Sequence, residues 1–389
     1  MGERAPEIDR TAGDLPPEGT LAQPDTSEVR SSTQLVKGRF GKLAIPLVAI
    51  FIFSVPLFLS DSYWLGILNV AGTAAIAGVA LNVLTGYAGQ ISLGHAFFVG
   101  IGAFTAQVVG GDPEGRVTAF GLPMLVWLPA AAVLAGITGA LIAPFALRLK
   151  GPYLAIVSLG LVFLGIFIAR NLTDLTGGNE GTTVSARATL GPLDFESLQV
   201  GSLVFPRENG MFLLIWGCLG IIMLFVANVM RSRSGRAMQA VRDHDIAAEV
   251  LGVRMFRTQA NAFVLSAAIA GVAGALLALN LQYIRPDNFD VNLSVQYLAI
   301  IVIGGMASAW GPVLGALFVG LVPVVVDRFA SNLPFMGSPT QEGLSTTDLQ
   351  LILYGALIVV FLILESKGLV ALITKVVSAL PGKRGTASA

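Results

Sequence analysis

Long apolar runs constrain this chain more than any other feature of its sequence. Hydrophobic residues make up 54% of it and charged residues only 12%, and its mean hydropathy is +0.76. Most of the runs reach the roughly 18–25 residues that an α-helix needs to cross a bilayer. They lie near 43–60, 64–84, 91–110, 123–147, 153–169, 211–230, 259–279, 295–307, 311–327 and 350–364. We therefore expect an all-α, polytopic membrane protein with about ten transmembrane helices.

Two of these runs leave the helix count open. The segments 91–110 and 295–307 are interrupted by glycines, so they could be broken or re-entrant, and eight or nine spans remain an alternative. A similar motif also opens a glycine-studded apolar run in each half, Gly89-x-x-Ser92-x-Gly94 in the first and Gly305-x-x-Ser308-x-x-Gly311 in the second. Two related halves with interrupted helices are typical of transporters. Such matches also arise by chance in glycine-rich membrane sequence. The motifs therefore indicate either an internal repeat of two halves or a chance similarity.

The ends of the chain differ from its middle. Residues 1–36 are polar and rich in proline, which predicts a disordered N-terminal tail, and no apolar core of a secretory signal adjoins the first residues. Residues 37–375 form the expected transmembrane domain, and 376–389 a short C-terminal tail. The single cysteine, Cys218, lies in an apolar run and has no partner for an intrachain disulfide.

Charges between the spans predict the orientation. If both termini are cytoplasmic, every basic cluster falls on the cytoplasmic side, as the positive-inside rule requires. The connection 171–210 then lies outside, where five acidic residues stand against two arginines. The basic residues counted on the inside are Lys37, Arg39, Lys42, Arg148, Lys150, the six arginines described next, Lys367 and Lys375.

A basic segment, Arg231–Arg257, separates two apolar runs. Small and apolar residues recur in it at three- and four-residue spacing, which predicts a helix with one apolar face, and Gly252 supplies a C-terminal break. Such a helix between membrane spans suggests a docking site for a cytoplasmic partner. Its six arginines are Arg231, Arg233, Arg236, Arg242, Arg254 and Arg257.

Residues for catalysis are nearly absent. His95 and His244 are expected at different depths, no cluster has the spacing of metal ligands, and no phosphate-binding loop of the G-x-x-x-x-G-K-[ST] type occurs, so we expect no metal site and ATP bound only by another chain. A membrane enzyme would need a cluster of such groups. A stand-alone secondary transporter or channel would need charges within the spans, and these are almost missing. The formal net charge of zero predicts no nucleic-acid partner.

Polar residues gather around the first interrupted run. His95 is the clear titratable group within a span, and it either contacts a substrate or gates by a hydrogen bond, or else it is a neutral histidine bonded to a neighbouring helix. Asn82, Gln90 and Ser92 accompany it and either line a substrate pathway or join helices.

Two glycine patterns favour structural roles. Ala267, Gly271 and Ala275 lie on one helical face, and Gly311-x-x-x-Gly315 is similar, so both predict close helix packing. The stretch 176–181, TGGNEG, shapes either a binding turn or a tight turn that needs glycine at positive φ.

Five blocks in order give the sequence a family resemblance. They are LNVLTGYAGQISLGHAFFVGIGA (81–103), TGGNEG (176–181), SGRAMQAVRDHDIAAEVLGV (234–253), FVLSAAIAGVAGALLA (263–278) and IGGMASAWGPVLGA (303–316). Together they resemble the LivM-like permease subunits of branched-chain amino acid ABC importers. ESKGL (365–369) resembles the short basic end of that family.

The resemblance implies a set of partners in a bacterial inner membrane. These are a second homologous permease, two cytoplasmic ATPase subunits, an extracytoplasmic substrate-binding protein and membrane lipid, with ATP used by the partners and no cofactor bound by this chain. Ala247-Ala248-x-x-x-Gly252 resembles the E-A-A-x-x-x-G loop by which such permeases dock on ATPases, with Ile246 in place of its glutamate. The expected ATPase-coupling residues are Arg236, Arg242, Ala247, Ala248, Glu249 and Gly252. Branched-chain amino acids are the expected cargo, with urea or short amides as the alternative.

Overall fold

The computed structural model describes residues 54, 61–148, 152–191, 193–197, 199–200, 203–330, 346–364 and 368–372. The chain divides into two compact units, 1–50 and 51–389, and every described residue belongs to the second. The expected tails, 1–36 and 376–389, and the expected first span, 43–60 apart from Ser54, lie outside the described residues.

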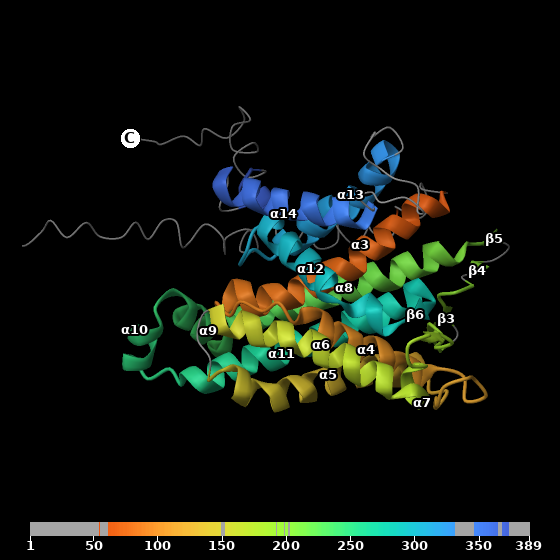
Figure 1. The fold of residues 1–389 in the computed structure, drawn as a ribbon, viewed down its shortest axis with the longest axis horizontal. Helices are drawn as coiled ribbons and strands as arrows, with labels where there is room; N and C mark the ends of the chain where they lie inside the picture. Colours follow the sequence, from red (N-terminus) through yellow and green to blue (C-terminus); the bar gives the residue numbers. More distant parts are fainter. Residues whose placement is uncertain are drawn as a thin grey trace, which may run out of the picture. The chain divides into compact units, whose positions relative to one another are not determined.

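Long helices make up most of the described unit, and they confirm the expected all-α class (Figure 1). Their ends fall within a few residues of the predicted apolar runs, because run length and flanking polar residues set where a buried helix can stop. The long helices are α3 (Ser62–Leu81), α4 (His95–Gly110), α5 (Met124–Ala146), α6 (Pro152–Asn171), α8 (Arg207–Arg231), α11 (Met255–Leu281), α12 (Val291–Gly304), α13 (Gly311–Ala330) and α14 (Thr346–Leu364).

Several of these helices match the dimensions of a membrane. Within the described ranges, five stretches are long and apolar enough to cross one: Ser62–Tyr87, Met124–Ala146, Tyr153–Asn171, Arg207–Arg231 and Met255–Leu281. His95–Gly110, Gly311–Val324 and Leu349–Val360 are shorter apolar helices. Of the expected run 91–110, residues 91–94 are not helical, and α4 then runs unbroken from His95 to Gly110.

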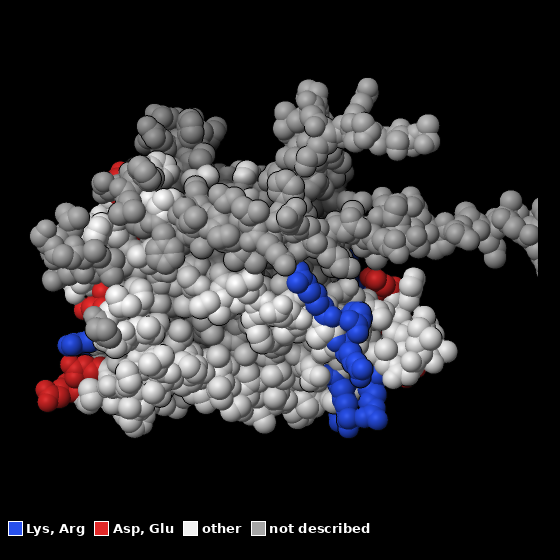
Figure 2. All heavy atoms as spheres, turned by 180° about the vertical axis from the view of Figure 1, so that it is seen from behind, with Lys and Arg blue, Asp and Glu red and all other residues white. Residues whose placement is uncertain are grey.

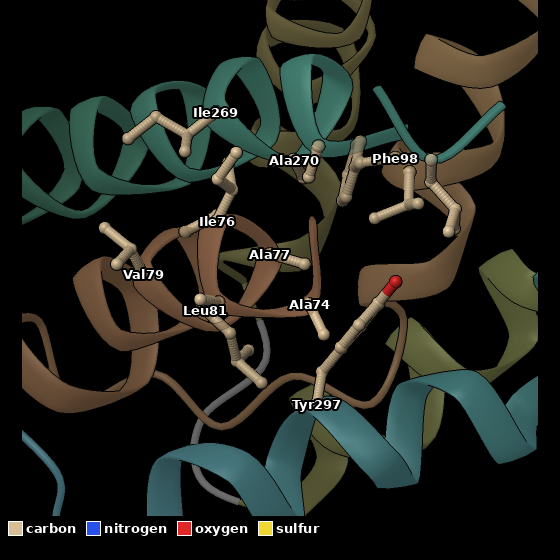
Figure 3. Close-up of a cluster of buried hydrophobic side chains, with 14 of the residues drawn as sticks. Ala74, Ile76, Ala77, Val79, Leu81, Phe98, Ile269, Ala270 and Tyr297 are labelled. Atoms are coloured by element: carbon tan, nitrogen blue, oxygen red, sulfur yellow. The ribbon is translucent and has the colours of Figure 1, made fainter. Parts of the chain in front are cut away.

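Two helices form the centre of the unit. In α3 with its extension, and in α11, 83% and 78% of the most apolar stretch is buried, against 28% in α5 and in α6. Figure 3 shows Ile76 and Ala77 of α3 facing Ile269 and Ala270 of α11, while Tyr297 reaches from α12 towards α3 and α4. Thus α3 and α11 are core helices, whereas fewer than a third of the residues in the most apolar stretch of α5 and of α6 are buried.

Glycines bring the core helices into backbone contact. A Cβ built on Gly102 of α4 would lie 1.9 Å from the carbonyl oxygen of Gly271, and one on Gly274 of α11 would lie 1.8 Å from that of Val99. The α12–α13 pair is as close, since a Cβ on Gly315 would lie 2.0 Å from the Ile300 oxygen. The two predicted packing faces are therefore confirmed, and in lipid such approach supplies van der Waals contact that larger residues would prevent.

Short elements cap the two ends of the helices (Figure 1). At one end, called the β6 end, β1 (Thr182–Thr183) pairs antiparallel with β6 (Tyr283–Ile284), next to α7 (Thr173–Thr176) and the 3₁₀-helix η3 (Pro286–Phe289). At the other, called the α10 end, lie α9 (Arg233–Asp243) and α10 (Asp245–Val250). Two further antiparallel pairs join β2 (Thr189–Leu190) to β3 (Leu193–Asp194) and β4 (Gln199–Val200) to β5 (Leu203–Val204).

The TGGNEG stretch serves the β6 end as a tight turn. Gly177, Gly178 and Gly181 have φ of 76°, 64° and 78°, a region that favours glycine. A Cβ on Gly181 would lie 2.2 Å from the carbonyl oxygen of Ile284, so the turn also needs glycine to pass β6. The neighbouring Glu180 binds Arg116 at 2.5 Å. These contacts support the structural interpretation of the motif.

Candidate functional site

A break between α3 and α4 forms the centre of the candidate site. The α3 helix continues as a π-helix, η2 (Asn82–Tyr87), and the chain then runs without helical structure to Gly94 before α4 starts. Gln90 closes the end of η2 with its backbone. Its backbone N–H donates to the Leu84 oxygen at 3.0 Å, and its backbone oxygen accepts from the Thr85 hydroxyl at 2.9 Å. Segments of π-helix occur frequently at functional sites.

Asn82 joins this first break to a second one, residues 305–310 between α12 and α13. Its amide nitrogen donates to the Ser308 oxygen at 2.9 Å, and its amide oxygen accepts from the Ala307 N–H at 2.8 Å. Ala307 has a positive φ of 58°, an uncommon conformation for a residue with a Cβ, so these two bonds support a strained turn between α12 and α13. The start of η2 and the second of the two similar motifs, Gly305–Gly311, are therefore neighbours in space.

The Asn82 bonds predict a measurable stability effect. We expect Asn82→Leu to lower the melting temperature of the purified protein by several degrees, because two partly buried backbone groups would each lose a partner at a cost of about 1–3 kcal/mol. Thermal unfolding in detergent measures this. Asn171→Leu is the matched control, since the Asn171 amide donates to Phe167 at an exposed helix end. Equal melting temperatures for Asn82→Leu and the control would contradict the bridging role.

The other polar residues of the break divide into satisfied and unsatisfied groups. Ser92 is buried, and its hydroxyl accepts from the Gly94 N–H at 3.3 Å, so it shapes the turn before α4. Gln90 is only 4% exposed and its side-chain amide has no partner among the described residues. The same holds for both ring nitrogens of His95, which is fully buried.

His95 occupies a constrained position at the start of α4. Its ring lies edge-on to Tyr297 of α12, with the ring centroids 6.3 Å apart. The carbonyl of Ala77 lies close by without the geometry of a hydrogen bond. The next N–H, of Ala96, donates to the Ser294 hydroxyl at 3.1 Å. His95 therefore lies between the backbone of α3 and the ring of Tyr297, and both predicted roles, a contact to substrate and a neutral histidine held by a neighbouring helix, stay predictions.

The basic segment forms two helices, α9 and α10, which corrects the single helix expected within Arg231–Arg257. Ser232 caps α9 by accepting from the Gly235 N–H, and the chain turns extended at His244, at φ −152° and ψ 96°, before α10 begins. The break lets the segment turn back over the helix ends. Gly252, at φ 86°, ends α10 as predicted: its N–H donates to Glu249, and the N–H of Val253 to Ala248.

The predicted coupling residues face different ways. Ala248 is buried at 2% exposure, so it packs against the protein itself and cannot offer its side chain to a partner. Arg236, Arg242, Ala247, Glu249 and Gly252 are exposed. Among the described arginines of the basic segment, Arg242 forms a salt bridge. It is a long one, with 3.9 Å between the Arg242 Nε and the Asp243 Oδ1.

Three aliphatic residues at α10 are exposed together, of which the sequence pattern had placed only Leu251, the residue after the helix, on the apolar face. Ile246, Val250 and Leu251 are 76%, 82% and 83% exposed, although they are large and apolar. Exposed apolar groups amid charges mark an interaction surface. The sequence does carry a sign of this surface. Ile246 precedes the pair Ala247-Ala248, and Val250 and Leu251 follow it, where an unpartnered surface helix would carry polar residues. We call Ile246, Val250 and Leu251 the aliphatic tip.

The basic segment touches the first break directly. A Cβ on Gly89, which has φ 70°, would lie 3.1 Å from Cγ of Arg242. Between them opens a cavity of about 320 Å³ that the break, the basic segment and the ends of three helices enclose. Its lining residues are Ala88, Gly89, Gln90, Ile91, Leu147, Leu154, Val241, Arg242, Asp243, His244, Asp245, Met255 and Gln259. A movement of α9 therefore reaches the break without any intermediate element.

A second cavity, of about 400 Å³, lies between α4, α5 and α6 towards the β6 end. Its lining is aliphatic and aromatic, and its hydroxyls, on Thr105, Thr138 and Thr176, all donate to carbonyls of their own segments. This cavity offers apolar surface but no free polar group. In addition, no group of three or more His, Cys, Asp or Glu residues that could hold a metal ion occurs in the described ranges.

Comparison with known proteins identifies the family of the chain. The family model described as branched-chain amino acid transport system / permease component matches residues 63–362. The chain belongs to this family. Its members named below are transport permeases rather than enzymes, and the match covers both breaks, the basic segment and the core helices.

Individual relatives agree with the family match. The permease protein LivM of the high-affinity branched-chain amino acid transport system of Escherichia coli K12 is 34% identical over 255 residues, 62% of this chain and 58% of that protein. The chain thus spans somewhat more than half the length of this relative. A probable LivM of Methanocaldococcus jannaschii is 22% identical over 303 residues, covering 77% of this chain and 82% of its own length. No solved structure matches.

Proposed function

We propose that this chain is the membrane permease subunit of an ATP-driven importer that carries branched-chain amino acids. Its partners would be a second, related permease, two ATPase subunits and an external binding protein, with ATP bound by the ATPases alone. The observation that carries the proposal is the aliphatic tip, presented on α10 beside an exposed row of arginines and one contact away from the first helix break. Apolar anchors with a charged rim are the composition of a docking surface.

The orientation follows from the charges at the two ends. Figure 2 shows Lys and Arg side chains in a column beside the α10 end and most Asp and Glu side chains at the other. The acidic residues exposed at the β6 end are Asp112, Glu114, Asp174, Glu180 and Asp287. The positive-inside rule then favours a cytoplasmic α10 end and an external β6 end, where a binding protein would dock. With an even number of spans both termini would be cytoplasmic, in a bacterial inner membrane.

Cysteine labelling tests this orientation. In a Cys218→Ala background, Glu114→Cys should react with an impermeant thiol reagent added to intact cells, and Arg233→Cys only after permeabilisation, since both positions are exposed at opposite ends. Ser185 is less suitable for labelling, because its hydroxyl accepts bonds from Gln107 and from the Asp112 N–H. The reverse labelling pattern would contradict the proposed topology.

The cargo is the less constrained part of the proposal. Relatives named as branched-chain amino acid permeases support these amino acids, although a protein named autoinducer 2 import system permease LsrC, from Klebsiella pneumoniae, is also 30% identical over 134 residues.

Reconstitution tests the whole proposal. The permease pair, its ATPases and its binding protein are placed in proteoliposomes, and uptake of labelled leucine is compared with and without ATP. We expect uptake that requires ATP. Uptake driven by a proton gradient without ATP would overturn the proposed energy source, and ATP-driven uptake of urea or an amide but not of leucine would overturn the cargo.

A further inference from the structure

The cavity between α4, α5 and α6, here called the apolar cavity, lies on a surface that faces lipid. Its walls include Leu134 of α5 and Ile168 of α6, which are 45% and 42% exposed. Both helices are long and apolar enough to cross a membrane, and both leave most of their residues unburied. The largely buried helix α4 packs against both and forms the inner wall. The cavity therefore opens between two membrane-spanning helices, where a bilayer surrounds the protein.

The length of the apolar cavity matches the depth of one leaflet. Along α4 its lining runs from Phe97 to Val109, a rise of about 18 Å in an α-helix. Along α6 it runs from Val162 to Leu172, a rise of about 15 Å. One leaflet contributes about 15 Å, half of a hydrocarbon core of about 30 Å. Because the lining starts near the middle of α5, at Thr138, and ends at η3, the cavity runs beside the acyl chains of the leaflet at the β6 end.

The chemistry of the lining suits a hydrocarbon chain. None of the described residues that line the apolar cavity is charged, and its three threonine hydroxyls already donate to carbonyls of their own segments. An amino acid would leave its ammonium and carboxylate groups unpaired there, which is costly. An acyl chain has no polar group to satisfy, and it gives the lining atoms the van der Waals contacts that a void would deny them.

An ion pair lies at the β6 end of the apolar cavity. The Arg170 Nη2 donates to the Asp287 Oδ1 at 2.6 Å, and both side chains are about half exposed. Arg170 follows the lining residue Ala169 on α6, and Asp287 follows the lining residue Pro286 in η3. Within the described residues this pair uses one guanidinium donor, so the other donors are open to phosphate oxygens. A phospholipid with a chain in the cavity would carry its phosphate at this depth.

We infer that the apolar cavity holds one acyl chain of a phospholipid from the leaflet at the β6 end, and that Arg170 binds the phosphate of that lipid. Such a lipid differs from those that surround any membrane protein, because its chain reaches α4 between α5 and α6. It also fills the space between α6 and the core, so it holds α6 against α4. The inference rests on the membrane-spanning helices, and it holds for either cargo and either orientation of the chain.

Photo-crosslinking tests the position of the acyl chain. The full-length chain is reconstituted in vesicles of phosphatidylethanolamine and phosphatidylglycerol, with a trace of phosphatidylethanolamine that carries a diazirine midway along one acyl chain. Adducts are mapped by mass spectrometry, and we expect them on Ile101, Phe104 and Val108 of α4 as well as on α5 and α6. Adducts on the exposed faces of α5 and α6 alone would mean ordinary surrounding lipid, and protection of all three helices would mean that a protein covers the cavity. Either result overturns the proposal.

Variants that fill the apolar cavity give the matched comparison. Ala169→Phe adds a ring from α6 and Thr138→Phe adds one from α5, both at lining positions. Ala140→Phe is the control, because Ala140 is exposed on α5 outside the lining. We expect α4 adducts to fall at least tenfold in both filling variants and to stay unchanged in the control, with the circular dichroism spectrum and elution volume showing that each variant is folded. Undiminished α4 adducts in the filling variants overturn the proposal.

Native mass spectrometry tests the headgroup contact. The chain extracted in mild detergent should retain one phospholipid, and the retained fraction should fall at least threefold in Arg170→Gln. Arg116→Gln is the matched control, since Arg116 forms an exposed ion pair with Glu180 at the same end, outside the cavity lining. Retention of a free fatty acid in place of a phospholipid, or equal retention in the two variants, would overturn the phosphate contact assigned to Arg170.

Discussion

Ile246→Asp should abolish transport-coupled ATP hydrolysis while leaving the permease folded and inserted. Ile246 is 76% exposed on α10, so a carboxylate there meets only water in the isolated subunit. In the assembled importer the same carboxylate would be buried against a partner, and loss of such a central apolar anchor typically costs about 2 kcal/mol or more, which is roughly a 30-fold loss of affinity. The measurement is ATPase activity stimulated by loaded binding protein, together with co-purification of the ATPases.

Two variants define the meaning of that result. Ile246→Leu keeps the apolar tip and should retain stimulation. A charge at Ala248 is a poor test of docking, because Ala248 is buried and the substitution would disrupt the basic segment itself. Full stimulation in Ile246→Asp, with the ATPases still bound, would remove the aliphatic tip from the docking surface.

Gly274→Val should prevent stable assembly of the helix core. A Cβ at this position would lie 1.8 Å from the Val99 carbonyl oxygen and 3.0 Å from the Ala103 nitrogen, so α11 and α4 would have to separate. Overpacking against side chains costs about 1–3 kcal/mol, and backbone atoms cannot move aside as side chains do, so we expect a loss at or above that upper value. The yield of monodisperse protein in mild detergent and its melting temperature report the change.

Gly217→Val is the matched control for this substitution. Gly217 lies within α8, another long apolar helix, and nothing lies within 4 Å of a Cβ built there. The two variants share the same change in helix propensity and hydrophobicity, so the difference between them isolates the backbone contact. Similar yields and melting temperatures for both would show that the α4–α11 approach is dispensable.

Sequence alone predicted the parts of the fold that depend on local composition. The helix ends followed because charged and glycine residues bound the apolar runs, as at Met124–Ala146 and Arg207–Arg231. The break before α4 followed because Gly89 and Gly94 interrupt a run otherwise suited to a helix. The position of Gly252 predicted the end of α10, since its hydrogen bonds are local.

Features set by distant contacts were not predictable in this way. Nothing near Asn82 in sequence indicates that its amide bonds to residues 307 and 308, because that pairing needs α12 and α13 in place. The alanine pair at 247–248 predicted where the docking helix lies but not which of its faces is exposed, because the structure buries Ala248 and exposes Ile246. His244 interrupts the segment although its neighbours suit a helix, so its extended conformation reflects how the segment folds back over the helix ends.

The π-helix between α3 and the break holds a reserve of chain length. A π-helix closes each hydrogen bond around one residue more than an α-helix does, so rewinding η2 as an α-helix would release chain into the linker Ala88–Gly94. One residue corresponds to about 1.5 Å of helix. Gly89 contacts Arg242 within that linker, so slack could be taken up or released there without unfolding any long helix. The π-helix thus sets how much chain is left for the linker between η2 and α4, which lies against the basic segment at Arg242.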